Sequence, residues 1–226
     1  MSVLDFLFPR RCLGCGKWDR YFCDSCLEKI EPIDYQVCPV CEKPAINGLT
    51  HFRCRRKFGL DGLTSIFPYK GMIKTAISKL KYHFVTDLAN ELVVLSAKHL
   101  SSHPISQTSP ILIPVPLHPR RERWRGFNQA ELLGKMLAGN FAWQFRNDIL
   151  MRHKNTKPQI GLKGAKRKEN IADAFSVNPQ FPKIYHLPSN ILLFDDVWTT
   201  GSTLKECGNV LKRVGAKKVW GLTLAR

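Results

Sequence analysis

The chain has 226 residues, which allows one domain of ordinary size and a second, small one. Its hydrophobic content of 44% is typical of a globular protein and argues against a disordered one. No apolar run approaches the ~18 residues of a membrane-spanning helix, which excludes an integral membrane protein of that kind. The 35 Lys and Arg against 18 Asp and Glu favour a polyanionic partner: nucleic acid, a phosphorylated metabolite or an anionic membrane surface.

The N-terminal apolar stretch VLDFLF is too short for the core of a signal peptide and contains Asp5. We therefore expect a cytoplasmic protein. Peripheral contact with the inner face of the membrane is the alternative.

Seven of the eight cysteines lie between Cys12 and Cys54, and His51 stands three residues before the last of them. Two residues between ligands let a tight turn aim both side chains at one ion, and tetrahedral zinc needs two such pairs. Four pairs therefore predict two closed, structural zinc sites. The eight candidate ligands are Cys12, Cys15, Cys23, Cys26, Cys38, Cys41, His51 and Cys54.

Pairing the neighbours gives one site of four cysteines and one of three cysteines and a histidine. A cross-braced arrangement would use the same ligands and stays open. A lone histidine is more often a surface residue, but the spacing of His51 from Cys54 favours a ligand. A disulfide framework is typical of secreted chains, and this one has no export signal. We place the boundary of this metal-binding region, residues 1–58, at the basic run before Gly59.

From residue 59 onward, short apolar segments alternate with helical patterns. This alternation predicts an α/β fold with a mostly parallel sheet and helices on both faces. Asn128 and Glu131 form a capping box at the start of one helix, and Cys207 falls on the apolar face of another, as a core residue. In chain order we expect a strand at 62–69, helices at 72–82 and 86–100, a strand at 111–115, a helix at 128–139, strands at 149–151, 174–177 and 191–194, a helix at 203–214 and a strand at 217–225.

The stretch ILLFDDVWTTGST, residues 191–203, joins a buried strand to a helix. Asp195 and Asp196 stand at the carboxyl end of the strand, where open α/β sheets bind ligands. The hydroxyl-rich loop Thr199, Thr200, Gly201, Ser202, Thr203 then leads into a helix N-terminus, which favours an anion. The pattern predicts a phosphate held by the loop and sugar hydroxyls held by the carboxylates. The alternative is that the aspartates merely cap the helix.

This stretch resembles the phosphoribosyl-pyrophosphate (PRPP) motif of type I phosphoribosyltransferases. The segments IPVPLHPRRERWRGFNQA and TKPQIGLKGAKRKENIADAF, with the cysteine-rich N-terminus, resemble the competence protein F (ComF) family, which includes the GntX-type proteins. The resemblance implies a double zinc ribbon at residues 1–58 and a phosphoribosyltransferase-like domain at 59–226. It departs from the family where His51 replaces the usual Cys and where Trp198 replaces a smaller residue.

The resemblance also implies roles for single residues. Asp195 and Asp196 would hold the ribose hydroxyls at the catalytic centre, and Thr199 to Thr203 would hold the 5′-phosphate. Magnesium would bridge pyrophosphate and ribose oxygens, and the acceptor is not identified. Residues of the loop at 116–121 and of a hood at 156–170 would face the pyrophosphate: Pro116, Leu117, His118, Arg120, Arg121, Gln159, Arg167 and Asn170.

Two functions remain open at this stage. One is a magnesium-dependent phosphoribosyltransferase. The other is a non-catalytic factor in DNA uptake that binds single-stranded DNA, works with competence proteins and uses PRPP as a regulatory ligand. Residues 118–170 hold 13 Lys or Arg against four acidic residues. Trp124, between Arg123 and Arg125, is a candidate for stacking on a base, whereas the alternating Phe141, Trp143 and Phe145 are expected in the core.

Overall fold

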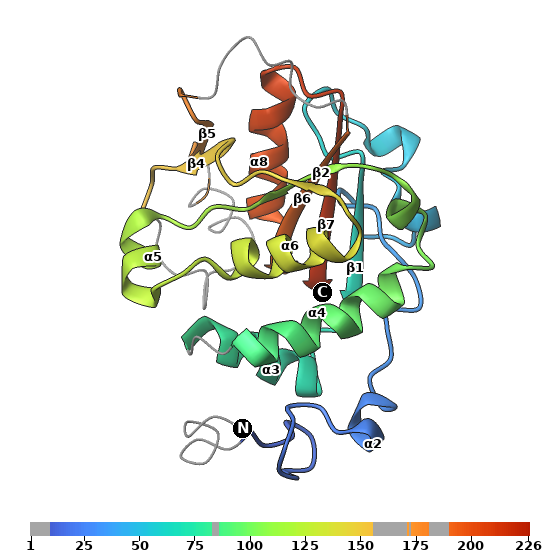
Figure 1. Cartoon of the computed structure of the whole chain (residues 1–226). Helices are drawn as coiled ribbons and strands as arrows, with labels where there is room; N and C mark the ends of the chain where they lie inside the picture. The colour runs from blue at the N-terminus through green and yellow to red at the C-terminus, as the bar shows by residue number, and fades with distance from the viewer. Residues whose placement is uncertain (1–9, 83–85, 156–170, 172, 181–189) are drawn as a thin grey trace.

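The computed structural model describes residues 10–82, 86–155, 171, 173–180 and 190–226. Its centre is a parallel five-stranded sheet in the order β1-β7-β6-β2-β3, beside a separate antiparallel pair, β4-β5 (Figure 1). The strands are β1 (Gly62–Phe67), β2 (Ile111–Pro114), β3 (Gln144–Phe145), β4 (Leu150–Arg152), β5 (Phe175–Val177), β6 (Asn190–Val197) and β7 (Lys218–Ala225).

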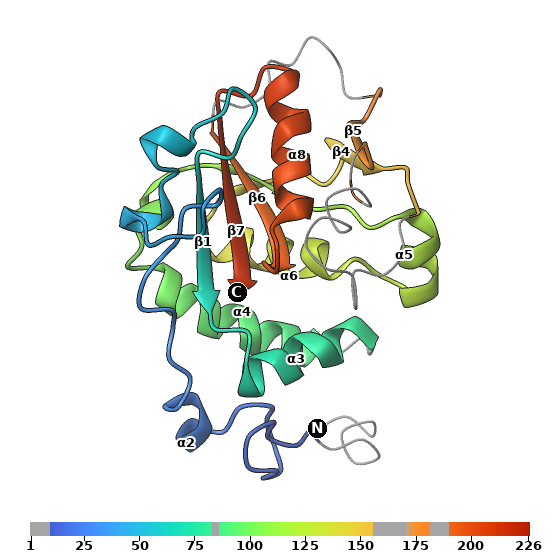
Figure 2. The same cartoon turned by 180° about the vertical axis from the view of Figure 1, so that it is seen from behind.

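Helices cover both faces of the sheet. The helices α4 (Thr86–Leu100) and α6 (Gln129–Asn140) lie on one face, and α8 (Ser202–Arg213) lies on the other, while α3 (Gly71–Tyr82) packs beside α4 near the carboxyl ends of the strands (Figures 1 and 2). Each face has its own cluster of buried apolar side chains. The predicted α/β fold is confirmed, and Cys207 is fully buried, as expected of a core residue. Trp143 is buried in the other cluster, stacked on Phe141.

Two local expectations need correction. The segments at 149–151 and 174–177 are strands, but they pair antiparallel with each other, outside the main sheet. The segment at 116–121 is only partly a loop, because α5 (Pro119–Arg125) begins within it. Proline is well suited to the first helical position, and Gly126, at φ +84°, ends the helix in the left-handed conformation.

The helix α6 is capped by Asn128, whose side chain accepts a hydrogen bond from the Ala130 amide at 3.1 Å. Glu131 was expected to complete a capping box. Its carboxylate instead accepts a hydrogen bond from Asn147 Nδ2 at 2.7 Å, which joins the helix to the segment that follows β3. The predicted cap is therefore present, and the acidic partner serves a tertiary contact.

The edge strand β1 is covered by the segment that holds the second group of predicted metal ligands. Gln36 makes two hydrogen bonds with the backbone of Ser65, at 2.8 and 3.0 Å, and Leu49 forms a bridge to Gly62. Gly48 lies so close to β1 that a Cβ atom there would stand 1.8 Å from the Leu63 carbonyl oxygen. An open strand edge is a site for unwanted pairing. The boundary after residue 58 stays a prediction, but residues before it protect the sheet.

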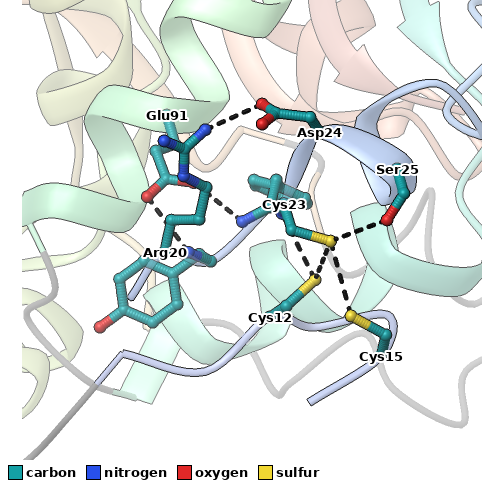
Figure 3. Close-up of polar contacts among 9 residues, drawn as sticks. Cys12, Cys15, Arg20, Cys23, Asp24, Ser25 and Glu91 are labelled. Carbon is teal, nitrogen blue, oxygen red and sulfur yellow. Dashed lines mark hydrogen bonds and ion pairs between the residues drawn. The ribbon is translucent and has the colours of Figure 1, made fainter. Parts of the chain in front are cut away.

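The first group of ligands lies beyond the carboxyl ends of the central strands, beside α3 and α4 (Figure 2). The two carboxylate oxygens of Glu91, in α4, accept hydrogen bonds from the backbone amides of Tyr21 and Phe22 at 3.1 and 2.9 Å (Figure 3). The Phe22 side chain is 1% exposed and belongs to the core cluster under α3 and α4. The Glu91 carboxylate and the Phe22 ring are therefore two of the contacts that attach this segment to the main body of the protein.

We expect Glu91→Gln to weaken that attachment, because an amide of the same shape loses the charge and turns a donor toward one of the two N–H groups. The loss in free energy of unfolding should be about 1–3 kcal/mol, measured by urea denaturation. Glu31→Gln, at an exposed position, is the matched control and should change stability by less than about 0.5 kcal/mol. Equal stability of Glu91→Gln and the control would contradict the attachment.

Candidate functional site

The eight predicted metal ligands form two separate clusters. Within each cluster the ligand atoms all lie within 4.8 Å of one another. In the first, Cys23 Sγ lies 3.6 Å from Cys12 Sγ and 3.5 Å from Cys15 Sγ (Figure 3). Four sulfurs at about 2.3 Å from a tetrahedral zinc ion would be about 3.8 Å apart, so the donor set fits zinc. The clusters are Cys12, Cys15, Cys23, Cys26 and Cys38, Cys41, His51, Cys54. Neighbouring pairs therefore come together, and the cross-braced alternative is wrong.

The two clusters have the same backbone framework. The amide of Cys12 donates to the carbonyl of Lys17, and the amide of Cys38 donates to that of Lys43. The second pairs match as well, because the Cys26 amide donates to the Cys23 carbonyl and the Cys54 amide to the His51 carbonyl. The sequence shows the repeat only as ligand spacing. The structure shows two copies of one metal-binding turn arrangement.

His51 occupies the position of a fourth ligand. Its Nδ1 atom lies 3.3 Å from Cys41 Sγ, and its Nε2 atom lies 3.1 Å from the Pro44 carbonyl oxygen. A metal-bound histidine commonly donates its other ring N–H to such an oxygen, which fixes the ring and its tautomer. His51 is thus arranged to ligate through Nδ1.

Metal analysis of the purified protein should give two zinc ions per chain. His51→Ala should reduce this to about one, because a three-sulfur site binds zinc more weakly, whereas His51→Cys should retain two. Cys207→Ala removes a thiol that lies outside both clusters and should leave the zinc content unchanged. One zinc ion per wild-type chain would show that the second cluster is not a working site.

A second group of polar residues lies at the carboxyl end of β6. Asp195 and Asp196 are adjacent there, and the Asp196 amide donates to Asp195 Oδ1 at 2.9 Å. Lys81, near the end of α3, places its Nζ atom 2.8 Å from Asp196 Oδ2. Both side chains of that ion pair are mostly buried, with 26% and 13% of their surface exposed. Burial lowers the pKa of Lys81, but the charge and hydrogen bond of Asp196 outweigh it, so the pKa is raised.

The two aspartates have different electrostatic environments. Burial raises the pKa of Asp195 to about 7, and the neighbouring charge of Asp196 adds to this effect. The hydrogen bond from the Asp196 amide and the charges of Lys81 and Arg152 oppose it. Near neutral pH the Asp195 carboxyl is therefore easily protonated, while Lys81 pairs with the neighbouring Asp196.

The loop after β6 ends at an open helix N-terminus. Gly201 is the N-cap of α8, with φ +66°, and no side chain caps the helix there. A Cβ atom on Gly201 would stand 2.1 Å from the Trp198 indole, so glycine is required both by the backbone and by the packing. Thr200 Oγ1 and Ser202 Oγ lie 2.8 Å apart, and the ammonium of Lys205 donates to the Thr200 carbonyl at 3.0 Å. Amides, hydroxyls and a cation thus converge where an anion is favoured.

Two arginines extend the positive charge toward the aspartates. Burial, and then the charge of Arg121, lower the pKa of Arg152, while Asp195 is close enough to raise it. Arg120 is exposed, and His118 is engaged locally, because its Nδ1 atom accepts from the Arg120 amide at 3.1 Å and caps α5. Pro116 and Leu117 are partly buried between β2 and α5. The predicted hood residues Gln159, Arg167 and Asn170 lie outside the described residues.

Comparisons with known proteins identify the family. Residues 3–55 match the double zinc ribbon domain family. The DNA utilization protein YhgH of Shigella flexneri is 30% identical over 222 residues, which cover 93% of this chain and 92% of that protein. The chain belongs to the competence protein F family. Competence protein ComFC of Bacillus subtilis is 28% identical over 96% of this chain and 88% of that protein. Competence protein F of Haemophilus influenzae is 40% identical over 119 residues, half of each chain.

Sequence reasoning missed three charged residues of this site: two lie near the aspartates, and the third contacts the loop after β6. Lys81 comes from α3, Arg152 from β4 and Lys205 from α8. Each lies in a separate segment, and only the folded chain brings them to one edge. Among the described residues, no helix is both long and apolar enough to cross a membrane.

The helix α5 presents the predicted stacking residue to solvent. The Trp124 side chain is 72% exposed, and its neighbour Arg123 is also exposed. Arg125, expected to contact nucleic acid as well, is partly buried and donates to Gln129 Oε1 at 2.6 Å. This basic helix surface, Arg120 to Trp124, lies beside the segment that leads from β2.

Proposed function

We propose that the protein binds PRPP with Mg²⁺ at the carboxyl end of β6 and transfers its phosphoribosyl group to an acceptor, releasing pyrophosphate. One observation carries the proposal. A buried strand ends in two adjacent carboxylates and turns at once into an uncapped helix N-terminus, as a sugar with a phosphate group would require.

The roles of the residues follow from their chemistry. Asp195 and Asp196 would accept hydrogen bonds from the two ribose hydroxyls and fix the ring. The 5′-phosphate would be held by the amides at the start of α8, by the hydroxyls of Thr200 and Ser202, and by the charge of Lys205. Lys81 pairs with Asp196, and it would share that carboxylate with a bound ribose.

In the transfer, the bond from the anomeric carbon to pyrophosphate breaks and a bond to the acceptor nucleophile forms, with the proton of the acceptor released. The leaving group carries most of the developing negative charge, so fixed positive charge beside it lowers the barrier. Arg121, whose charge acts on the nearby Arg152, would supply that charge from the protein. Carboxylate and phosphate oxygens are suitable ligands for Mg²⁺, which would neutralise the pyrophosphate when bound.

A pyrophosphate-release assay tests this activity. PRPP and Mg²⁺ are incubated with the zinc-loaded protein and with purine, pyrimidine or amine acceptors. Release that depends on one acceptor class, and that falls at least 100-fold in Asp195→Asn/Asp196→Asn, is the expected result. Release at the same rate in that variant, or none with any acceptor, would contradict a transferase.

A second function is favoured by the basic helix surface, Arg120 to Trp124. We propose that this surface binds single-stranded DNA, with Trp124 stacking on a base and the arginines contacting phosphates. The full-length relatives named for DNA utilization and competence support this function. Here PRPP would be a regulatory ligand.

Fluorescence anisotropy with a labelled oligonucleotide tests DNA binding. The logarithm of the affinity should fall linearly with the logarithm of salt concentration, by about 0.7 for each phosphate contact. Trp124→Ala should weaken binding about tenfold or more, as expected for one stacked base. The matched control is Trp18→Ala, because Trp18 is also exposed and lies 3.9 Å from the Arg11 guanidinium. Equal DNA affinities of the two variants would contradict a specific contact between Trp124 and DNA.

A further inference from the structure

A pocket of about 180 Å³ lies at the amino ends of the central strands, at the opposite edge of the sheet from the aspartates. It is bounded by Asn190 and Leu192 of β6, by Lys218 and Trp220 of β7, and by residues of the η3 turn (Pro104–Gln107) and of the second metal-binding segment. Asn190 and Asp195 are five residues apart on one strand, roughly 17 Å at about 3.3 Å per residue. The two sites are therefore separate.

One wall of the pocket is an indole held in a fixed position. The Trp220 ring lies against Gly62 of β1, where a Cβ atom would stand 2.2 Å from it, and its Nε1 atom donates to Thr64 Oγ1 at 2.9 Å. Gly62 and Thr64 fix the ring from the sheet side, and the 8% of Trp220 that is exposed borders the pocket, where the Lys218 ammonium lies 5.8 Å from the ring centroid. Leu192 and Ile105 add apolar surface beside the ring. A flat, apolar wall of this kind suits a planar ring system.

The polar groups of the pocket are side-chain amides and an imidazole. In the described part of the chain, the carboxamides of Asn47 and Asn190 have no hydrogen-bond partner, and both border the pocket. His103 Nδ1 accepts from the Ile105 amide at 3.2 Å, which leaves its proton on Nε2, toward Thr64 Oγ1. Burial lowers the pKa of His103, so the imidazole is neutral near pH 7. The pocket thus offers donors and acceptors without a fixed negative charge.

We propose that this pocket is a second ligand site and that it takes a purine base. A purine is planar, so it can stack on Trp220, and its edge carries the adjacent donor and acceptor that an asparagine carboxamide recognises in pairs. The volume is below the roughly 300–1,000 Å³ of pockets for drug-sized ligands, which suits a single fused ring. Lys218 at the border would accommodate a phosphate attached to such a base.

The second zinc cluster contributes to this site. Asn47 and Leu49 lie between the predicted ligands Cys41 and His51, so a zinc ion bound there would fix the turn that carries them. Asn47 has φ +50°, a left-handed conformation that asparagine tolerates better than most residues. The site is therefore assembled from the zinc-binding segment and the sheet together.

Calorimetric titration with adenine, which has neither ribose nor phosphate, tests the proposal on the full-length, zinc-loaded protein. Saturable binding is expected, unchanged by saturating PRPP and by Asp195→Asn/Asp196→Asn. Asn190→Leu and Asn47→Gly should each weaken it about three- to tenfold, as expected for a lost hydrogen bond. Glycine accepts the backbone conformation of Asn47, so that variant removes the carboxamide without adding strain.

Asn140→Leu, at the exposed end of α6, is the matched control and should bind adenine like the wild type. Adenine should also quench tryptophan fluorescence in the wild type but not in Trp220→Phe. Absence of saturable binding would overturn the proposal. So would binding that is lost in the double aspartate variant or competed by PRPP, because adenine would then occupy the ribose-phosphate site.

Discussion

Removing zinc from the protein is expected to lower its thermal midpoint sharply and to cause aggregation. The second metal-binding segment covers the edge strand β1, and the first is attached to α4 through Glu91. Structural zinc contributes about 10–16 kcal/mol of apparent binding free energy in isolated zinc-finger peptides. We therefore expect a loss of at least about 5 kcal/mol here, comparable to the whole stability of many domains.

Circular dichroism melts and light scattering, with and without a zinc-selective chelator, measure this effect. Restoring zinc should recover the midpoint, whereas magnesium should not. His51→Ala should show an intermediate loss and should aggregate more than Cys15→Ser, because only the second cluster lies next to the β1 edge. An unchanged midpoint after complete zinc removal would contradict a structural role for both clusters.

Replacing Asp195 with asparagine is expected to stabilise the protein above neutral pH. The pKa of Asp195 is about 7 in the folded chain and about 3.9 in an unfolded one. Between these values the folded state binds more protons, so the free energy of unfolding falls as pH rises. The total loss from this group is on the order of 2–4 kcal/mol at pH 8. Asparagine resembles the protonated acid and still accepts from the Asp196 amide, so Asp195→Asn should lack this loss.

Urea denaturation at pH 5.5 and pH 8 compares the wild type with Asp195→Asn. Asp148→Asn is a control whose expected effect on the free energy of unfolding has the opposite sign. The hydrogen bonds from Arg146 lower the pKa of Asp148, so its stabilising effect is present above its unfolded pKa and lost as pH falls. Removing the Asp148 carboxylate should lower the free energy of unfolding only slightly, because the Arg146–Asp148 ion pair is partly exposed. An Asp195→Asn protein less stable than the wild type at pH 8 would show that the folded protein prefers the charged form.

The sequence predicted most of the fold because its local signals agree with the tertiary structure. Apolar runs before Asp195 and after Gly215 became central strands, and Asn128 capped its helix. The antiparallel β4-β5 pair could not be distinguished from the main sheet, since a three-residue apolar strand reads the same in either setting. The helix α5 was not predicted, because its arginine-rich sequence is also typical of a basic loop.

The candidate sites were predicted to different degrees for a physical reason. Zinc ligands and the two aspartates lie close together along the chain, so their spacing alone indicates the chemistry. Lys81 and Arg152 reach the aspartates only through packing, and no local pattern marks them. The pocket beside Trp220 is even harder to predict from the sequence, because its lining residues lie up to 173 positions apart, from Asn47 to Trp220.

Calorimetric titration of PRPP, with and without Mg²⁺, tests the central claim most directly. The wild type and Asp195→Asn/Asp196→Asn are compared at pH 8, above the pKa of about 7 of Asp195 in the folded chain. Each lost charge-assisted hydrogen bond should cost about 1.5–3 kcal/mol, so the double variant should bind at least 100-fold more weakly. Saturable, magnesium-dependent binding that disappears in the variant is the result we expect. No binding to the folded, zinc-loaded wild type, or equal binding to both proteins, would contradict a ribose-phosphate site at this edge of the sheet.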